Sequence, residues 1–369
     1  MWISLTRVNH STGAKWANLG AAFLPFADPA DTGLPLSRLF RLSLFQVTVG
    51  MAVVLLIGTL NRVMIVELGV PVWLVATMIS LPLVFAPLRA LIGWKSDTHR
   101  SVLGWRRVPY LWMGTLMQFG GLSIMPFALI LLSGDSNAAP WVGQAAAALA
   151  FLMVGAGLHT VQTVGLALAT DISRPESHPK VVAMLCIMLL LGMVVSALLF
   201  GAVLANFSQI RLIQVVQGAA VATMVLNAIA LWKQEARDPA RTARDRAEPS
   251  FIETWRAFNT GRQSRRRLVA LGMGTVAFSM QDILLEPYGG HVLGLSVAST
   301  TAMTALLAMG GVLGFVLAAR RLGRGDDPYR LAGVGALSGL VAFSAVIFAA
   351  PFESTPMFAT GVGMIGFGA

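Results

Sequence analysis

The chain has 369 residues, of which 56% are hydrophobic and 12% are charged, and its mean hydropathy is +0.72. A soluble fold with this composition would expose too much apolar surface to stay in solution, so an integral membrane protein is predicted. The net charge of +10 is carried mainly by loops that alternate along the chain, a distribution that points away from nucleic acid as a partner and toward a lipid bilayer.

Residues 1–41 are predicted to form a cytoplasmic N-terminal tail. They contain Asp28, Asp31 and several prolines before the first long apolar run, unlike the charged start and short apolar stretch of a cleavable signal peptide. Lysine and arginine also gather in every second loop that follows, and the positive-inside rule therefore places the N-terminus in the cytoplasm. The basic loops are 95–107, 174–180, 233–267 and 320–330.

Ten apolar runs follow the tail, each close to the roughly 20 residues that span a bilayer core. Six form a predicted N-terminal bundle over residues 42–232, and four form a C-terminal bundle over residues 268–369. The last run is still apolar at Ala369, so we expect the C-terminal bundle to be truncated. The predicted spans are Leu42–Leu60, Val72–Trp94, Val108–Leu132, Val142–Thr170, Val181–Ala205, Leu212–Trp232, Leu268–Pro287, Val297–Ala319, Leu331–Pro351 and Thr355 onward.

Residues 233–267 are predicted to be a cytoplasmic linker between the two bundles. Within it, Ser250 and Glu253 have the spacing of a capping box, in which each side chain bonds the backbone N–H of the other residue. Large aromatic side chains then recur at helical spacing, which favours a short amphipathic helix lying on the membrane surface. These aromatic residues are Phe251, Trp255 and Phe258.

The first and seventh spans resemble each other. Each begins after an Arg-Leu pair and places an amide, then a charge, then a glutamate near its outer end. Such a repeat is similar to the plan of the major facilitator superfamily, in which two six-helix bundles are related by an axis along the membrane normal. We therefore predict this all-α fold, with about ten spans present and the second bundle incomplete. The matched residues are Asn61, Arg62 and Glu67 in the first span, and Gln281, Asp282 and Glu286 in the seventh.

Asp282 and Glu286 are spaced i, i+4 and therefore share one helix face. Carboxylates inside a membrane are costly, and they usually face a cavity or a partner. Because Arg62 occupies the equivalent place in the first half, we predict that Arg62 and Asp282 pair across the two bundles and close the outer end of the cleft. The alternative is that these groups only reach the headgroup region.

The polar strip from Gly93 to Arg107 resembles the conserved cytoplasmic loop of the major facilitator superfamily. Its gap from Asp97 to the following glycine and paired arginines is longer than in the usual version. An ion pair made by Asp97 could latch the two bundles together, and the alternative is a basic loop that only sets the topology. The candidate latch residues are Gly93, Asp97, Arg100, Gly104, Arg106 and Arg107.

Four polar residues inside the spans could line a ligand cleft: Arg89, Gln118, His159 and Gln162. Arg89 could bind an anionic group or extend toward the nearby interface. His159 could supply an axial ligand to the magnesium of a large flat pigment, whereas interhelical hydrogen bonding is the alternative for His159, Gln162 and Gln118. The sequence contains no phosphate-binding loop, no metal-ligand spacing and no nucleophile–base pattern, so we expect no catalytic residues, no resident metal and no enzymatic activity.

Several longer strings closely resemble the PucC and LhaA proteins of purple phototrophic bacteria, the bacteriochlorophyll-associated branch of the same superfamily. The resemblance implies a twelve-helix protein of the inner (intracytoplasmic) membrane that assists assembly of light-harvesting antenna complexes. It also implies bacteriochlorophyll as cargo, and antenna polypeptides, the photosynthetic core complex or pigment-synthesis enzymes as partners. The matching strings are Leu42–Val47, Gly58–Gly69, Phe85–Gly93, Ser96–Ser101 and Gln281–Gly290.

Two other functions remain open from the residues alone. A proton-coupled solute transporter would use Asp282 or Glu286 as its proton carrier. A membrane scaffold for pigment-synthesis enzymes would bind its partners and move nothing.

Overall fold

The computed structural model describes residues 36–100, 104–133, 139–236, 242, 250–259, 262–281 and 284–369. These residues form helices and no strand, and eight of the helices are long and apolar enough to cross a membrane. The predicted all-α membrane class is therefore confirmed. The side chain of Phe258 and the residue Asp282 lie outside what is described.

The first half begins with one long helix, in which α2 (Leu36–Val53) continues into the π-helical segments η1 (Val54–Leu60) and η2 (Val63–Glu67). The helices that follow are α3 (Val72–Val84), α4 (Leu88–Asp97), α5 (Val108–Leu132), α6 (Pro140–Asp171), α7 (His178–Val203) and α8 (Gln209–Leu231), with the short 3₁₀ turn η3 (Pro175–Ser177) before α7.

The second half comprises α9 (Phe251–Asn259), α10 (Arg262–Ser279), α11 (Leu285–His291), α12 (Val297–Gly323), α13 (Pro328–Ala349) and α14 (Thr355–Gly368). The seventh predicted span is divided between α10 and α11, with turn conformation at Met280, Gln281 and Leu284. The tenth predicted span corresponds to α14.

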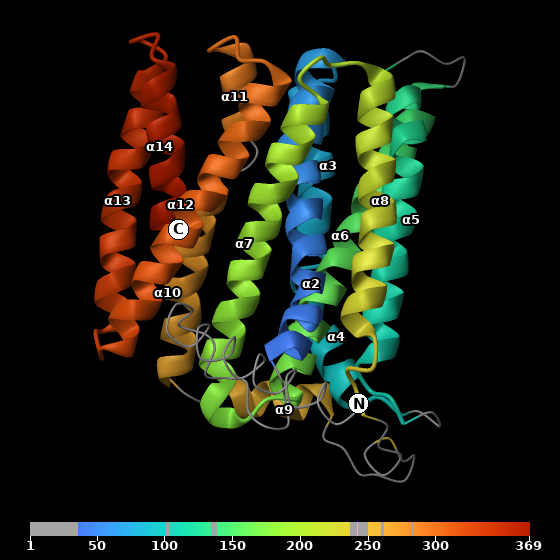
Figure 1. Ribbon diagram of the computed structural model, residues 1–369, viewed down its shortest axis with the longest axis vertical. Helices are drawn as coiled ribbons and strands as arrows, with labels where there is room; N and C mark the ends of the chain where they lie inside the picture. The colour runs from blue at the N-terminus through green and yellow to red at the C-terminus, as the bar shows by residue number, and fades with distance from the viewer. Residues whose placement is uncertain are drawn as a thin grey trace, which may run out of the picture.

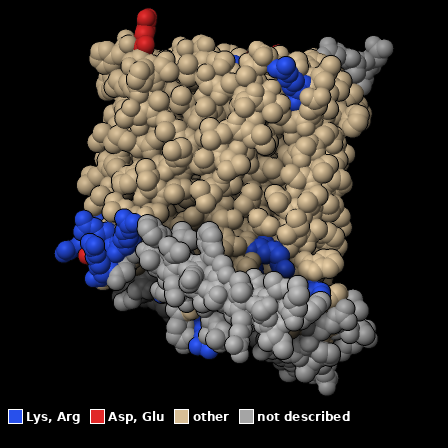
Figure 2. All heavy atoms as spheres, viewed as in Figure 1, with Lys and Arg blue, Asp and Glu red and all other residues tan. Residues whose placement is uncertain are grey.

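The long helices stand side by side, with α2–α8 on one side of the molecule and α10–α14 on the other (Figure 1). The two halves meet chiefly where α12 packs along α7, with additional contact between α12 and η1 and between α11 and η2. Figure 2 shows a wall almost free of charged side chains on this face, with lysine and arginine gathered mainly at one end. We call this the basic end; it holds α9, the start of α5 and the ends of α4 and α6.

The predicted capping box starts α9. The backbone N–H of Ser250 donates to the Glu253 carboxylate at 2.9 Å, and the N–H of Glu253 donates to the Ser250 hydroxyl at 3.3 Å. The Phe251 and Trp255 rings stack at 6.2 Å, and Phe251 also meets Trp94 of α4 edge-on at 6.0 Å. The capping box and the short helix that follows it are confirmed, and the aromatic contact joins this helix to the first half.

A glycine lets α5 and α6 pack closely. A Cβ atom added at Gly157 would lie 2.5 Å from the backbone nitrogen of Gln118 and 2.6 Å from the carbonyl oxygen of Gly114. Both neighbours are backbone atoms, so the two helices would have to move apart.

We therefore expect Gly157→Val to lower the free energy of unfolding by about 2 kcal/mol, because overpacking a tight contact costs about 1–3 kcal/mol. The matched control is Gly218→Val on α8, where an added Cβ meets no atom within 4 Å. Thermal unfolding of both variants in detergent checks this. Equal unfolding temperatures for the two would contradict the close packing.

Candidate functional site

The C-terminal half of the first span changes from α-helix to π-helix, and π-helical turns are frequent at functional sites. This segment faces the second half. A Cβ atom at Gly58 would collide with the carboxylate of Glu286 and lie 3.2 Å from the hydroxyl of Thr304. Glycine at this position therefore allows α11 and α12 to approach η1.

Arg62 lies at the boundary between the halves and is 4% exposed. Its guanidinium pairs with Glu67 at 2.5 Å and also donates to the carbonyl of Leu295, which precedes α12, at 3.2 Å. A pair five residues apart is unusual in an α-helix, but the wider π-helical turn brings such residues into line. Arg62 therefore binds one group in each half.

Glu286 is buried between the halves at 5% exposure. The Thr304 hydroxyl donates to one of its carboxylate oxygens, while Oε2 has no hydrogen-bond partner in the described part of the chain. Its carboxylate lines a cavity of about 140 Å³, which is large enough for several water molecules. The other lining residues are Val53, Ile57, Gly58, Met193, Gln281, Leu285, Thr304 and Leu307. We call this the seam cavity, because it lies between η1 and α7 of one half and α11 and α12 of the other.

The predicted pair between Arg62 and Asp282 stays a prediction, because Asp282 is outside the described residues. The described acidic partner of Arg62 is Glu67 on its own helix. Arg62 and Glu286 are both buried between the halves. Asn61 is fully buried beside them, and Gln281 lines the seam cavity.

The loop residues gather around Arg107 at the basic end. Its guanidinium pairs with Asp97 at the end of α4 and with Asp171 at the end of α6, the latter at 2.9 Å, and donates to the Ser96 hydroxyl at 2.6 Å. Arg106 also pairs with Asp171, at 2.8 Å. All of these partners belong to the first half.

The described ion pairs of Asp97 and Arg107 thus differ from the predicted latch between bundles. They tie α4, α5 and α6 together because the two aspartates end neighbouring helices where α5 begins. Gly93 packs toward Thr163 of α6, and Arg100 is exposed after α4. Gly104 is buried and has a φ of 77°.

Glu235 belongs to the same cluster and was not identified from the sequence. Its carboxylate accepts hydrogen bonds from the backbone N–H groups of Arg106, Arg107 and Val108 at 2.9–3.0 Å. It therefore caps the start of α5, where the residue preceding the helix provides no side-chain cap. Glu235 and Asp171 also line a cavity of about 250 Å³ at the basic end.

Comparison with known proteins identifies the family. A family model described as "PUCC protein" matches residues 59–369. The chain belongs to the PucC family. It is 58% identical to Protein PucC of Rhodovulum sulfidophilum, with 99% of this chain and 82% of that protein aligned. It is 54% identical to Protein PucC of Cereibacter sphaeroides, over 95% of this chain and 77% of that protein. It is also 28% identical to the bacteriochlorophyll synthase 44.5 kDa chain of Rhodobacter capsulatus, over 73% of this chain and 60% of that protein.

Solved structures similar to this PucC family member include transporters. The inward-open xylose transporter XylE from E. coli has a TM-score of 0.58 and 10% identity, and the match covers 90% of this chain and 80% of XylE. An inward-facing bacterial homologue of the human lysosomal transporter Spinster has a TM-score of 0.57 and 19% identity, and the match covers 90% of this chain and 72% of the homologue. At these identities the likeness concerns the fold alone, and it confirms the predicted major facilitator fold.

Gln118 of this PucC family member lies in the core of the first half and not at the seam. It is fully buried, and its amide donates to the carbonyl of Thr48 at 3.0 Å. Thr48 in turn donates to Asn227 at 2.9 Å, and Asn227 donates to Thr115 at 3.0 Å. These bonds join α2, α5 and α8, so the expectation that Gln118 lines a ligand cleft is wrong and the interhelical alternative fits.

The other three intramembrane candidates lie where α4 and α6 meet or beside that contact. Arg89 donates to the Thr163 hydroxyl at 2.9 Å. His159 is half-buried one turn before Thr163, close enough for the Arg89 charge to act on its ring. Gln162 is half-buried beside Thr163 on α6.

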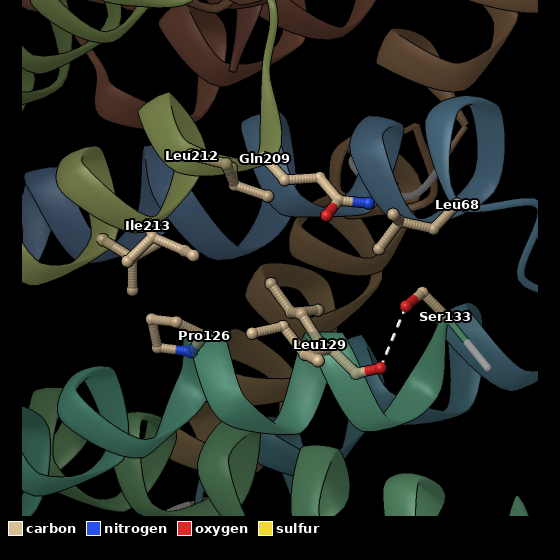
Figure 3. A pocket seen from close by; sticks show the side chains of 9 residues that line it. Leu68, Pro126, Leu129, Ser133, Gln209, Leu212 and Ile213 are labelled. Atoms are coloured by element: carbon tan, nitrogen blue, oxygen red, sulfur yellow. Dashed lines mark hydrogen bonds between the residues drawn. The ribbon is translucent and has the colours of Figure 1, made fainter. Parts of the chain in front are cut away.

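A further small pocket lies between α5 and α8 (Figure 3). The Gln209 side chain points toward Leu68, and the Ser133 hydroxyl bonds back to the carbonyl of Ile130 at 2.9 Å. The pocket volume is about 20 Å³, enough for a single water molecule. This pocket is therefore too small to bind an organic ligand.

Proposed function

We propose that this chain is an assembly factor for a photosynthetic light-harvesting antenna complex. It handles bacteriochlorophyll, or the antenna polypeptides that receive it, and catalyses no reaction itself. It resides in the inner (intracytoplasmic) membrane with its N-terminus in the cytoplasm. Membership of the PucC family supports this role, and so does the relative whose name associates it with bacteriochlorophyll synthesis.

The composition of the seam cavity is the observation that carries the proposal. Six of its lining residues are apolar or glycine, and the polar ones are Gln281, Glu286 and Thr304. A sugar-like solute needs several converging polar groups, whereas an apolar pigment with one magnesium needs an apolar wall and a single oxygen or nitrogen ligand. The seam cavity, at about 140 Å³, holds only part of such a pigment, and Glu286 Oε2, which has no described hydrogen-bond partner, can supply that ligand.

The meeting of α7 and α12 provides a second element of the proposal. Antenna polypeptides that cross the membrane as single helices can dock by close helix packing, which small residues favour. Within this chain, Gly201 of α7 already packs in this way against Ala298 of α12, with an added Cβ 3.3 Å from its carbonyl oxygen, so antenna polypeptides would dock beside this contact. Cargo at this boundary would pass between protein and lipid without entering water.

A proton-coupled transporter is the second candidate function. The observation in its favour is a buried carboxyl group between the two halves of a transporter fold, since such a group can carry a proton when the halves move. The scaffold for pigment-synthesis enzymes has no observation of its own to favour it.

The test is purification of the chain in mild detergent from a phototrophic host, followed by an absorption spectrum and mass spectrometry. The proposal expects bacteriochlorophyll or antenna polypeptides to co-purify at a fixed ratio to the chain. A colourless protein that drives proton-coupled uptake in vesicles would favour the transporter instead. Retention of pigment-synthesis enzymes with neither pigment nor antenna polypeptides would favour the scaffold.

A further inference from the structure

Helices α4 and α6 run side by side in register from the basic end inward. Asp97 and Asp171 end the two helices, and both bind Arg107. Eight residues before each aspartate, Arg89 and Thr163 are joined by a hydrogen bond of 2.9 Å. At 1.5 Å per residue this contact lies about 12 Å inside the helix ends. The guanidinium of Arg89 is therefore held about two helical turns inside the ends of α4 and α6.

The charge of Arg89 has no acidic partner among the described residues. Its Nε–H donates to Thr163, and none of the ion pairs in the described part of the chain includes it. A guanidinium has five N–H donors, so four remain for a ligand. A cation at this depth is costly unless it faces water, an opposite charge or a bound anion.

His159 adds a second polar group at the same place. It lies one turn before Thr163 on the same face of α6. Neither ring nitrogen makes a hydrogen bond of normal geometry, although the carbonyl of Pro82 is near the ring. The imidazole can therefore offer one N–H to a ligand held by Arg89.

The site adjoins an exposed apolar face. The second span is interrupted between Val84 and Leu88, where α3 ends and α4 begins. Leu83, Val84 and Leu88 around this break are all exposed in the described structure, so an apolar chain can lie against them. A molecule with an apolar tail can reach Arg89 from this side without crossing the protein.

We propose that Arg89, positioned by Thr163 and assisted by His159, binds the phosphate headgroup of an anionic amphiphile that enters from the lipid side. Two guanidinium N–H groups can meet two oxyanion oxygens in parallel, a geometry that favours arginine over lysine. The apolar tail lies over Leu83 and Leu88. This inference does not depend on the proposed function, because it concerns a different part of the fold from the seam cavity.

The test measures lipid retained by the purified chain after reconstitution into nanodiscs of mixed phosphatidylglycerol and phosphatidylcholine. Native mass spectrometry counts the lipids that stay bound. Arg89→Gln is expected to reduce retained phosphatidylglycerol about tenfold, the scale of a lost charge-assisted hydrogen bond, and to leave phosphatidylcholine unchanged. The matched control is Arg211→Gln at the opposite end of the bundle, where Arg211 bonds the Asn206 carbonyl; it should retain as much as the wild type.

A second variant and a competition measurement extend the test. Thr163→Val keeps the charge but removes the hydroxyl that positions it, and should reduce retention about threefold. Adding soluble inorganic phosphate identifies the source: displacement of the lipid shows that the anionic group suffices, and no displacement shows that the tail is required. Equal retention of phosphatidylglycerol by wild type and both α4–α6 variants would overturn the proposal, as would an equal loss of both lipids.

Discussion

Arg107→Gln is expected to lower the free energy of unfolding by about 2 kcal/mol, because the Arg107 side chain is 5% exposed while solvent screens part of the charge of Asp97 and Asp171, which are 54% and 30% exposed. The glutamine would leave Asp97, Asp171 and the Ser96 hydroxyl without the guanidinium that joins them. Since those partners end α4 and α6 where α5 begins, the three helices should separate together at the basic end. Thermal unfolding in detergent, with limited proteolysis of the loop around residue 104, measures both effects.

Arg106→Gln is the matched control, because the neighbouring arginine also binds Asp171. Its side chain is 18% exposed, compared with 5% for Arg107, so solvent screens its charge more and we expect a loss of about 1 kcal/mol or less. Combining Arg107→Gln with Asp97→Asn should cost less than the sum of the two single changes. Similar losses for the two arginine variants would show that Arg107 is not the centre of the cluster.

The sequence predicts the spans well because each depends on a local property. An apolar run of bilayer length identifies a membrane helix wherever its neighbours lie, and a capping box involves residues only three apart. The capping box of Ser250 and Glu253 is present as predicted, and the apolar runs before residue 233 form membrane-length helices. The second half follows the pattern less closely, since the seventh run becomes α10 and α11 instead of one helix.

The site is harder to predict because it depends on contacts between distant residues and on a local change of helix type. Glu235 caps α5 across more than 120 residues, and no spacing rule connects the two. An α-helical wheel places Arg62 and Glu67 apart, and only the π-helical turn pairs them. Gln118 shows the opposite error: an intramembrane amide fits a ligand site and an interhelical bond equally well until its neighbours are known.

The internal repeat also hides a functional asymmetry. Glu67 and Glu286 occupy matching places in the first and seventh spans. Glu67 pairs with Arg62 and is partly exposed, whereas Glu286 is buried against Thr304 at the seam cavity. The repeat therefore predicts where polar groups occur, but the packing of α11 against η1 determines which glutamate faces the cavity.

Glu286→Leu is expected to reduce the antenna complex per cell about tenfold, since among the described residues it removes the one carboxylate that lines the seam cavity. The measurement is the antenna absorption of a phototrophic host that lacks its own copy of the gene and carries the variant, at matched protein abundance. Gly58→Val should give a similar loss, because its side chain would displace the Glu286 carboxylate. Glu67→Gln is the control and should lose no more than about twofold, because Glu67 does not line the cavity. If cells that carry Glu286→Leu contain as much antenna complex as wild-type cells, the proposed role of the seam cavity is wrong.

Glu286→Gln then separates a ligand from a proton carrier. Glutamine retains a carbonyl oxygen that accepts from Thr304 and a polar atom facing the cavity, but it cannot gain or lose a proton. If the side chain holds cargo through an oxygen, this variant should keep about half of the antenna level, because a neutral amide oxygen binds a metal or a donor more weakly than a carboxylate does. If the halves move in response to protonation, the variant should be as defective as Glu286→Leu. The second outcome would replace pigment handling by proton coupling as the function of this glutamate, even though the packing around Gly58 and Thr304 would be unchanged.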